Sequence, residues 1–367
     1  MSLSPLSTHT YINDPVALAA ALTTANHDKK MRVRDAAEFL GVSECELVAT
    51  QVGSVATRLN QDWVSILQRV KSIGRVLALT RNYAVVHERK GVYLDASATG
   101  HMGLVLGDDI DLRLFFSQWQ YGYALTEIDG DTTKRSIQFF DGAGDAVHKI
   151  FLQPESAADE FDMVVEQFRA DDQAPGQRVH ARKAPLKMVV NTAIDVDAFR
   201  AAWANMQDTH EFFGLLKKFA VARTDAFRLA DPMFVEQVSV MAAKNMLEAA
   251  SARQAEIMCF VGNVGCIQIH TGPVNNIKVM GPWLNVLDAD FNLHLRQDML
   301  AEAWVVKKPT ADGIVTSLEL FDRDGIQLAQ FFGKRKPGNP ERQDWREIIE
   351  SIVANASIAQ VESRVAA

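Results

Sequence analysis

Nine histidines are present, and a metal-ligand or acid–base interpretation of the chain must start from them. His210 stands out because it lies in the stretch 208–213 (DTHEFF), among apolar neighbours. A neutral imidazole is a good ligand for iron, and apolar surroundings suit a porphyrin. The alternative is a core histidine whose ring N–H donates to a backbone carbonyl. The residue type and its neighbours leave both interpretations open.

Several cations could bind a carboxylate or another small anion. Arg113 lies in the strand-like stretch 111–116 (DLRLFF), where it must either face solvent or meet an anion in a cleft. Two further groups of positive charge are Lys307-Lys308 and the stretch 334–336 (KRK). Because such groups are usually only solvated loop ends, each of them has a binding and a solvent-facing interpretation.

Motifs for other chemistry do not occur in the sequence. It has no GxxxxGK[ST], GxGxxG, HExxH or GxSxG pattern. The three cysteines, Cys45, Cys259 and Cys266, form neither CxxC nor CxxCH. This spacing argues against a zinc ribbon, a thioredoxin-like pair and covalently attached c-type haem.

The composition is that of a globular protein: 367 residues, 48% hydrophobic and 23% charged, with a net charge of −8. A generic nucleic-acid surface needs an excess of Lys and Arg, so we expect no nucleic-acid partner. The helix–turn–helix-like stretch 34–49 is interpreted as a structural helix pair for the same reason. With no long apolar run and no signal peptide, we expect a cytoplasmic protein that is not embedded in a membrane.

The chain repeats itself at a constant spacing. The stretch 136–151 (SIQFFDGAGDAVHKIF) matches 317–332 (SLELFDRDGIQLAQFF), 181 residues later, and Asn82 matches Asn263 in the same register. A register that holds for some 70 residues without a gap indicates a tandem duplication. We predict repeats at 11–170 and 188–357, joined by a polar linker with two prolines at 171–187.

Each repeat begins with a helical region and continues with strands. The helical regions are 34–49 and 196–229, and apolar positions in the second recur every three or four residues, at Trp203, Met206, His210, Phe213 and Leu216. This spacing predicts a buried helical stripe that includes His210. The stretch 257–272 has two apolar runs around a Gly-Asn turn, which predicts strands, and the period-two alternation of 314–333 around Asp324-Gly325 predicts a hairpin. The fold class is therefore α+β, with a large antiparallel sheet and flanking helices in each unit.

The two repeats differ at the candidate ligand. Aligning 39–48 with 218–227 places Met31 opposite His210 and Glu44 opposite Arg223. A histidine needed only to pack the shared unit would be expected in both copies. The asymmetry raises the case for a specialised role of His210, although drift in one copy gives the same pattern.

From about Arg34 to Ile352 the sequence resembles the HemS/ChuS family of cytoplasmic haemin-transfer and haemin-degrading proteins. The resemblance rests on DLRLF, SIQFFD, DTHEFFGLLKKF, EIMCFVGNVGCIQI, AEAWVVKKPTADGIVTSLELFD and AQFFGKR. It implies two tandem α+β repeats and haem b (iron protoporphyrin IX) held in a cleft between the halves.

The resemblance also implies residue roles. His210 takes the proximal, iron-ligating position, and Arg113 takes the distal position, where a tentative catalytic role is implied. The propionates fall to Arg223, Lys308 and Arg335, the ring contacts to Phe260 and Phe115, and a further pocket contact to Gln330. Phe332 replaces a tyrosine of related proteins, His270 could face the pocket or solvent, and His87 is a weak option for a second haem contact.

Two classes of function follow from the resemblance. One is a carrier in haem uptake and iron acquisition, which receives haem after import, with the inner-membrane importer as a partner, and passes it to a haem oxygenase. The other is an enzyme that opens the porphyrin with dioxygen and an external reductant. We favour the carrier with some degrading activity, because the sequence has no flavin or reductase site.

Overall fold

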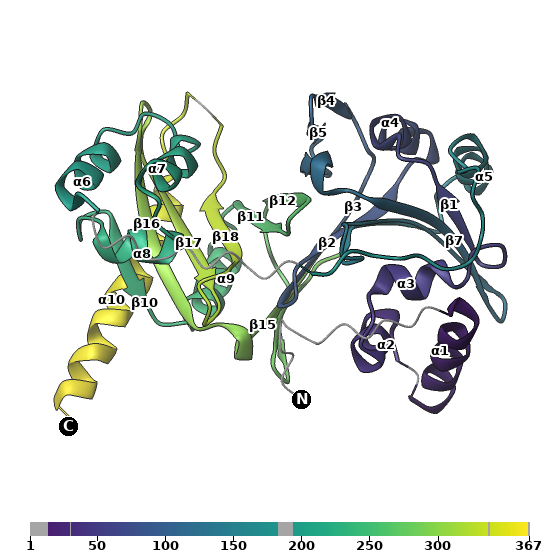
Figure 1. Ribbon diagram of the computed structural model, residues 1–367. Helices are drawn as coiled ribbons and strands as arrows, with labels where there is room; N and C mark the ends of the chain where they lie inside the picture. The colour runs from purple at the N-terminus through teal and green to yellow at the C-terminus, as the bar shows by residue number, and fades with distance from the viewer. Residues whose placement is uncertain (1–13, 30, 183–193, 337, 366–367) are drawn as a thin grey trace. The chain divides into compact units, whose positions relative to one another are not determined.

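The computed structural model describes residues 14–29, 31–182, 194–336 and 338–365. The chain divides into two compact units (Figure 1). Unit 1 contains the described residues of 1–83, 87–185 and 262–268, and unit 2 those of 84–86, 186–261 and 269–367. Each unit therefore includes a short segment of the other repeat, which the sequence did not lead us to expect.

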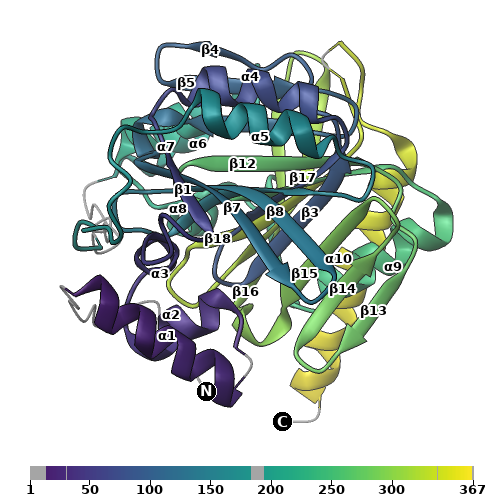
Figure 2. The same ribbon diagram turned by 90° about the vertical axis from the view of Figure 1, so that its right-hand side faces the viewer.

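In its described residues, unit 1 combines five helices with strands of two antiparallel sheets. Its helices are α1 (Pro15–Lys29), α2 (Val33–Leu40), α3 (Glu44–Ala49), α4 (Trp63–Ile73) and α5 (Ala158–Gln167). Six strands follow the order β1 (Ala56–Leu59), β7 (Tyr121–Asp129), β8 (Thr132–Phe140), β9 (Ala146–Leu152), β2 (Val76–Arg81) and β3 (Val85–Gly91). Three more are ordered β6 (Asp111–Phe115), β5 (Met102–Leu106) and β4 (Ser97–Thr99), with the short helix η1 (Phe116–Gln118) after β6. Figures 1 and 2 show α4 and α5 side by side.

Unit 2 has the same plan. Its helices are α6 (Val196–Ala204), α7 (Glu211–Phe219), α8 (Arg223–Leu229), α9 (Ala242–Arg253) and α10 (Gln343–Val365). Six strands follow the order β10 (Val235–Val238), β16 (Glu302–Thr310), β17 (Gly313–Phe321), β18 (Gln327–Gly333), β11 (Ile257–Gly262) and β12 (Cys266–Gly272). Three more are ordered β15 (Phe291–Arg296), β14 (Trp283–Leu287) and β13 (Ile277–Met280), with η2 (Gln297–Met299) after β15. The repeated order confirms the predicted tandem α+β fold.

The hairpins β8–β9 and β17–β18 show the duplication in atomic detail. Asp141 accepts hydrogen bonds from the backbone N–H groups two and four residues later, and Asp322 does the same. Gly144 (φ 79°) and Gly325 (φ 74°) supply the left-handed residue that each turn requires. The strand register shifts at equivalent points, at Phe139/Phe140 and at Leu320/Phe321.

The main sheet of unit 2 is covered by helices on both faces. On one face α6, α7 and α8 form an aromatic core with Trp304, Val306 and Phe321. On the other face α10 packs against α9, β10 and β18, and Trp345 lies so close to Gly333 that no side chain would fit there. Trapping β16 and β17 between helices fixes the positions of the side chains they carry.

The helical region predicted for 196–229 is three helices rather than one. After α6, the side-chain amide of Asn205 donates to Ala201 O at 2.7 Å, and the backbone N–H of His210 donates to the Asp208 carboxylate at 2.8 Å. Short polar side chains such as these offer the backbone partners outside a helix. They end α6 and start α7 in a new direction, which changes the side chains that face the core.

The segment 262–268 is firmly held in unit 1. The Asn263 side chain donates to Arg81 O at 2.9 Å and to Val147 O at 2.8 Å. Gly265 O accepts from the Trp119 indole and from Phe115 N, both at 2.9 Å. Unit 2 repeats the last contact, since Ala84 O accepts from Arg296 N at 2.9 Å.

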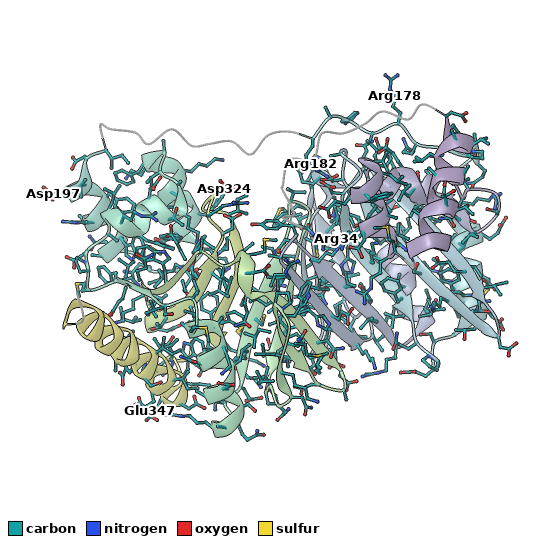
Figure 3. The ribbon with its side chains drawn as sticks, turned by 90° about the horizontal axis from the view of Figure 1, so that it is seen from below. Arg34, Arg178, Arg182, Asp197, Asp324 and Glu347 are labelled. Atoms are coloured by element: carbon teal, nitrogen blue, oxygen red, sulfur yellow. The ribbon has the colours of Figure 1, made fainter. Side chains whose placement is uncertain are left out.

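The described part of the predicted linker, 171–182, runs along unit 1 (Figure 3). Gly176 N donates to Ala49 O at 2.8 Å, and Arg182 binds the Asp145 carboxylate at 2.9 and 2.5 Å. Residues 183–187 lie outside the described residues. Among the described residues, no helix combines the length and apolar character needed to cross a membrane.

Candidate functional site

His210 immediately precedes α7, and its side chain is 93% exposed. The predicted buried stripe is therefore wrong at this point. Trp203 and Met206 are buried as expected, but Phe213 is 70% exposed. The break between α6 and α7 turns Phe212 and Leu215 toward the core in their place.

The imidazole of His210 is held by one neighbour. Its Nδ1 lies 2.6 Å from Oδ1 of Asp208, which also accepts the His210 backbone N–H at 2.8 Å. These two hydrogen bonds keep the pKa of Asp208 below its usual range. Since an ionised carboxylate can only accept, Nδ1 carries a proton in this contact, and in the neutral imidazole Nε2 is then the nitrogen open to a metal.

The segment 205–210, which carries His210, is hydrogen-bonded to the turn between β16 and β17. Gln207 O accepts from Ala311 N at 2.9 Å. The neighbouring Asp312 binds Arg335 at 3.1 Å, and the positive charge of Arg335 also lowers the pKa of Asp208. The structure thus brings Arg335, one of the predicted cations, close to the loop that carries His210.

An open stretch of the sheet lies beyond the helices of unit 2. Phe260 pairs with Gln330 across β11 and β18, and Gln330 pairs with Glu319 across β18 and β17. Paired residues project from the same face, and Phe332 joins them because it lies two residues after Gln330. Phe260, Gln330 and Phe332 are partly exposed, and the two phenyl rings meet edge to face at 5.2 Å. This open face can pack against a flat apolar ligand.

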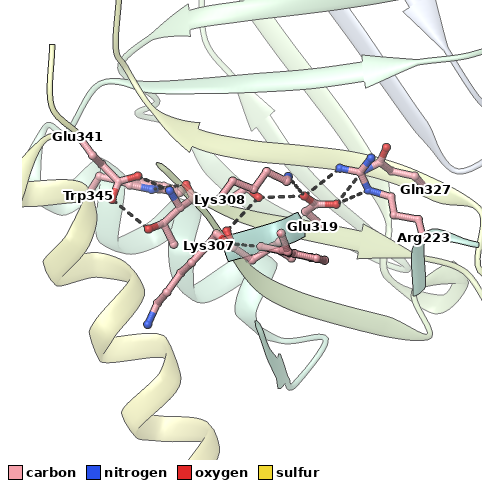
Figure 4. A network of polar contacts seen from close by, with 11 residues as sticks. Arg223, Lys307, Lys308, Glu319, Gln327, Glu341 and Trp345 are labelled. Atoms are coloured by element: carbon pink, nitrogen blue, oxygen red, sulfur yellow. Dashed lines mark hydrogen bonds and ion pairs between the residues drawn. The ribbon is translucent and has the colours of Figure 1, made fainter. Parts of the chain in front are cut away.

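Next to the open face, Arg223, Lys308 and Glu319 form the ion triad of unit 2 (Figure 4). Glu319 is fully buried and accepts from Arg223 at 2.7 and 3.0 Å and from Lys308 at 2.7 Å. Ser317 and Gln327 donate to the same carboxylate at 2.9 and 3.1 Å. The triad has two positive charges and one negative charge, so it retains a net attraction for an anion.

Burial and charge set the protonation states of the triad. Burial and the Arg223 charge lower the pKa of Lys308 to about 8, although Glu319 opposes the change. Burial alone would raise the pKa of Glu319, but Arg223 and Lys308 more than offset this and hold it below its usual range. The carboxylate is therefore ionised at neutral pH.

Phe212 links the triad to the helix that follows His210. The Arg223 guanidinium lies 4.9 Å and the Lys308 ammonium 4.8 Å from the centre of its ring, and Lys308 lies 5.9 Å from the ring of Phe332. Such cation–aromatic contacts hold both cations on the same side of the sheet. The triad therefore lies between α7 and the open face.

On its opposite face, β17 is fixed to the start of α10 (Figure 4). Thr316 N donates to the Glu341 carboxylate at 2.6 Å, and the Trp345 indole donates to Thr316 O at 3.0 Å. Burial raises the pKa of Glu341. These contacts make β17 a rigid support for Glu319.

One protein family matches both repeats. Its haemin-degrading HemS.ChuX domain matches residues 41–168 and again residues 220–352. The chain belongs to this family. The haemin-degrading HemS.ChuX assignment confirms the resemblance seen in the sequence.

Two curated relatives of the family come from Yersinia. Hemin transport protein HmuS of Yersinia pestis is 40% identical over 336 residues, which cover 91% of this chain and 96% of the relative. Hemin transport protein HemS of Yersinia enterocolitica is 40% identical over 317 residues, which cover 86% of this chain and 91% of the relative.

Solved structures match more than nine-tenths of this chain. Holo-PhuS, a heme-binding protein from Pseudomonas aeruginosa, matches with a TM-score of 0.91 and 47% identity, covering 93% of this chain and 99% of that one. ChuS, an E. coli heme oxygenase, matches with a TM-score of 0.83 and 36% identity, covering 92% of this chain and 99% of that one.

Two residues expected at the site of this HemS-type chain belong to unit 1. Arg113, on β6, is ion-paired with Asp111 and donates to Leu112 O at 3.2 Å. Phe115 is partly exposed at the end of the same strand. Because His210 belongs to unit 2, the roles of Arg113 and Phe115 opposite it stay predictions.

Two further histidines of this HemS-type chain are buried. His270 is 2% exposed and stacks on Phe291 at 3.7 Å with an interplanar angle of 2°. His270 therefore does not face solvent, and its contact with the haem pocket stays a prediction. His87 is fully buried as well, and its role in a second haem contact stays a prediction.

Sequence reasoning missed Asp208, Glu319 and Asp312. Asp208 had a readable signal, since an Asp side chain commonly accepts the backbone N–H two residues later in an Asx turn. Glu319 had a weaker one: in the alternating strand 314–321 it shares a face with Ser317 and Phe321, which predicts a buried carboxylate in need of partners. Asp312 becomes a partner of Arg335 only through the tertiary fold.

Proposed function

We propose that the chain binds haem b, with Nε2 of His210 as the axial ligand of the iron. The observation that carries the proposal is the exposed imidazole, whose Nδ1 is engaged by Asp208 and whose Nε2 therefore has its lone pair outward. Iron-ligating histidines in proteins commonly hand their other ring N–H to such an acceptor.

The rest of unit 2 fits the other parts of haem. The open face of Phe260, Gln330 and Phe332 suits a porphyrin edge, and the triad with Arg223 and Lys308 suits a propionate. Arg335 is a second carboxylate partner, since its Nε is buried without a hydrogen-bond partner among the described residues. A matched charge and shape favour haem over a bare metal ion.

We propose a cytoplasmic carrier role in haem uptake, with transfer to a haem oxygenase and supply from an inner-membrane importer. The curated relatives named as hemin transport proteins support this choice. Degradation is the second candidate, because the similar ChuS is described as a heme oxygenase. Bound haem would supply the iron that reacts with dioxygen; this chain would hold the iron by His210 and would place the Arg113 guanidinium as a distal hydrogen-bond donor.

Haem titration tests the ligand. We expect His210→Ala to change the Soret maximum and to weaken binding at least about tenfold, or ~1.4 kcal/mol. His180→Ala removes another exposed imidazole and should leave both unchanged. Arg113→Ala should leave affinity nearly intact but alter the sixth ligand. A His210→Ala spectrum identical to wild type would remove His210 as the ligand.

Aerobic turnover separates carrier from enzyme. The loaded protein is mixed with an external reductant, with and without catalase, and the tetrapyrrole products are identified. For a carrier we expect slow haem loss that catalase suppresses, and faster transfer to a haem oxygenase. A defined ring-opened product formed at the same rate with catalase would establish the enzyme instead.

A further inference from the structure

Asp208 makes two contacts with the same residue. Oδ1 accepts the backbone N–H of His210 at 2.8 Å and its ring Nδ1–H at 2.6 Å. The first bond fixes the backbone at the start of α7, and the second fixes the rotation of the ring. One carboxylate oxygen thus fixes both the backbone position of His210 and the rotation of its imidazole ring.

The position of Asp208 is itself fixed from two sides. The preceding residue, Gln207, is bound through its carbonyl oxygen to Ala311 N at 2.9 Å, on the turn between β16 and β17. The following residues are locked into α7, where Glu211 N donates to Asp208 O at 3.1 Å. The carboxylate is therefore presented by a braced loop.

The contact between Asp208 and His210 is solvated in this structure, with side-chain exposures of 59% and 93%. A flat ligand over His210 would remove water from it. Hydrogen bonds to a charged group strengthen when water is excluded. The carboxylate would then draw the Nδ1 proton toward itself and make Nε2 a stronger electron donor.

We propose that Asp208 is a positioning residue that orients His210 and raises its donor strength toward the haem iron. This inference rests on the proposed role of His210 as the axial ligand. A stronger axial donor favours ferric over ferrous iron, so Asp208 would keep the bound haem oxidised and resistant to reduction. Resistance of the bound haem to reduction would favour transport of intact haem over its reductive degradation.

The test measures the iron–histidine bond rather than turnover. Resonance Raman spectra of the ferrous haem complex report the iron–imidazole stretching frequency, and a spectroelectrochemical titration reports the midpoint potential. For Asp208→Asn we expect a lower stretching frequency and a more positive potential, with haem still bound. Asp208→Glu keeps the negative charge and should restore part of both shifts.

A matched control is available on the same unit. Asp231 accepts the backbone N–H of Met233 at 2.9 Å, the same local contact, but no histidine among the described residues is its partner. Asp231→Asn should therefore leave frequency and potential at wild-type values. Equal shifts in Asp208→Asn and Asp231→Asn would overturn the proposal.

His210→Ala separates this inference from the proposed function. If it abolishes the iron–imidazole band while Asp208→Asn keeps the wild-type frequency and potential, the positioning role is wrong and the ligand assignment stands. If the band survives in His210→Ala, the ligand assignment is wrong and the role of Asp208 falls with it.

Discussion

The buried cores of the two units differ in polarity at positions 181 residues apart. In unit 1, His148 is buried and its two ring nitrogens lie 2.5 Å from the Tyr93 hydroxyl and 2.8 Å from the Thr80 hydroxyl. The three residues found 181 positions later in unit 2 are all buried and apolar: Val261, Val274 and Ala329. Unit 1 therefore hides a histidine network where unit 2 has a plain hydrocarbon core.

The ion triads of the two units place their carboxylate and their cations on different elements. In unit 1, Glu44 on helix α3 is bound by Lys149 at 2.6 Å and by Arg81. In unit 2 the helix supplies the cation, Arg223, and the strand supplies the carboxylate, Glu319. The charges have exchanged places between helix and sheet, while the number of each sign stayed the same.

The hairpin turns are the same in both units, although these side chains differ. Equivalent hairpins retain their Asp-and-Gly turns, as described above for Asp141 and Asp322. A duplicated fold thus tolerates exchange of buried polar groups as long as each group keeps a partner. In unit 2, which carries His210, the helix of the triad supplies a cation, Arg223.

Removing the central carboxylate should have the largest effect. Glu319→Gln leaves the buried Lys308 and the partly exposed Arg223 without a counter-charge, and breaking a buried ion pair costs about 3–5 kcal/mol. We expect Glu44→Gln in unit 1 to destabilise by a similar amount, because the triads have the same charge count. Urea unfolding, followed by probes in each unit, measures both.

The control is Glu347→Gln on α10, which removes an exposed ion pair with Arg253 and should change stability by less than about 1 kcal/mol (Figure 3). If Glu319→Gln were no more destabilising than this control, the triad would be only a surface-like ion pair and the comparison would fail.

The buried His148 of unit 1 should make the stability of that unit depend on pH. Burial lowers the pKa of His148 from its usual value of 6.5 to about 3. Between these values the unfolded chain binds a proton that the folded chain does not, so stability falls as pH drops, by up to about 1.4 kcal/mol per pH unit. Unfolding of wild type and His148→Asn at pH 7, 6, 5 and 4 measures the difference in slope. Parallel curves would show that His148 titrates normally.

Much of the fold could be predicted because local and repeated signals agreed. The strand alternation, the Asp-Gly turns and the spacing of 181 residues all indicated paired α+β units. The helix break at Asn205 was missed because apolar periodicity continued through it, while short polar side chains decided the backbone. The inclusion of residues 262–268 of the second repeat in unit 1 was missed because it depends on tertiary contacts such as that of Asn263 with Arg81.

The candidate site was predicted in its cations and its histidine but not in their partners. Resemblance supplied His210 and Arg223, since these lie in long matching stretches. The carboxylates Asp208 and Glu319 are placed by the loop and the strand register, so sequence alone could not show which cations they bind. The apolar periodicity predicted that His210 is buried in the core, whereas its side chain is exposed in the structure.

The smallest predicted effect concerns the helix end before the triad. Both α2 and α7 end in the same left-handed cap, formed by Gly41 (φ 69°) in unit 1 and by Ala220 (φ 49°) in unit 2. The following N–H groups bond back alike, Val42 to Ala37 O at 3.0 Å and Val221 to Leu216 O at 3.1 Å. Because a left-handed Ala is strained and Gly is not, Ala220→Gly should stabilise unit 2 by about 0.5–1 kcal/mol. Thermal unfolding of this variant and of the reciprocal Gly41→Ala, which should lose a similar amount, checks the symmetry. A loss of stability in Ala220→Gly would mean that the methyl group of Ala220 contributes more packing than its backbone strain costs.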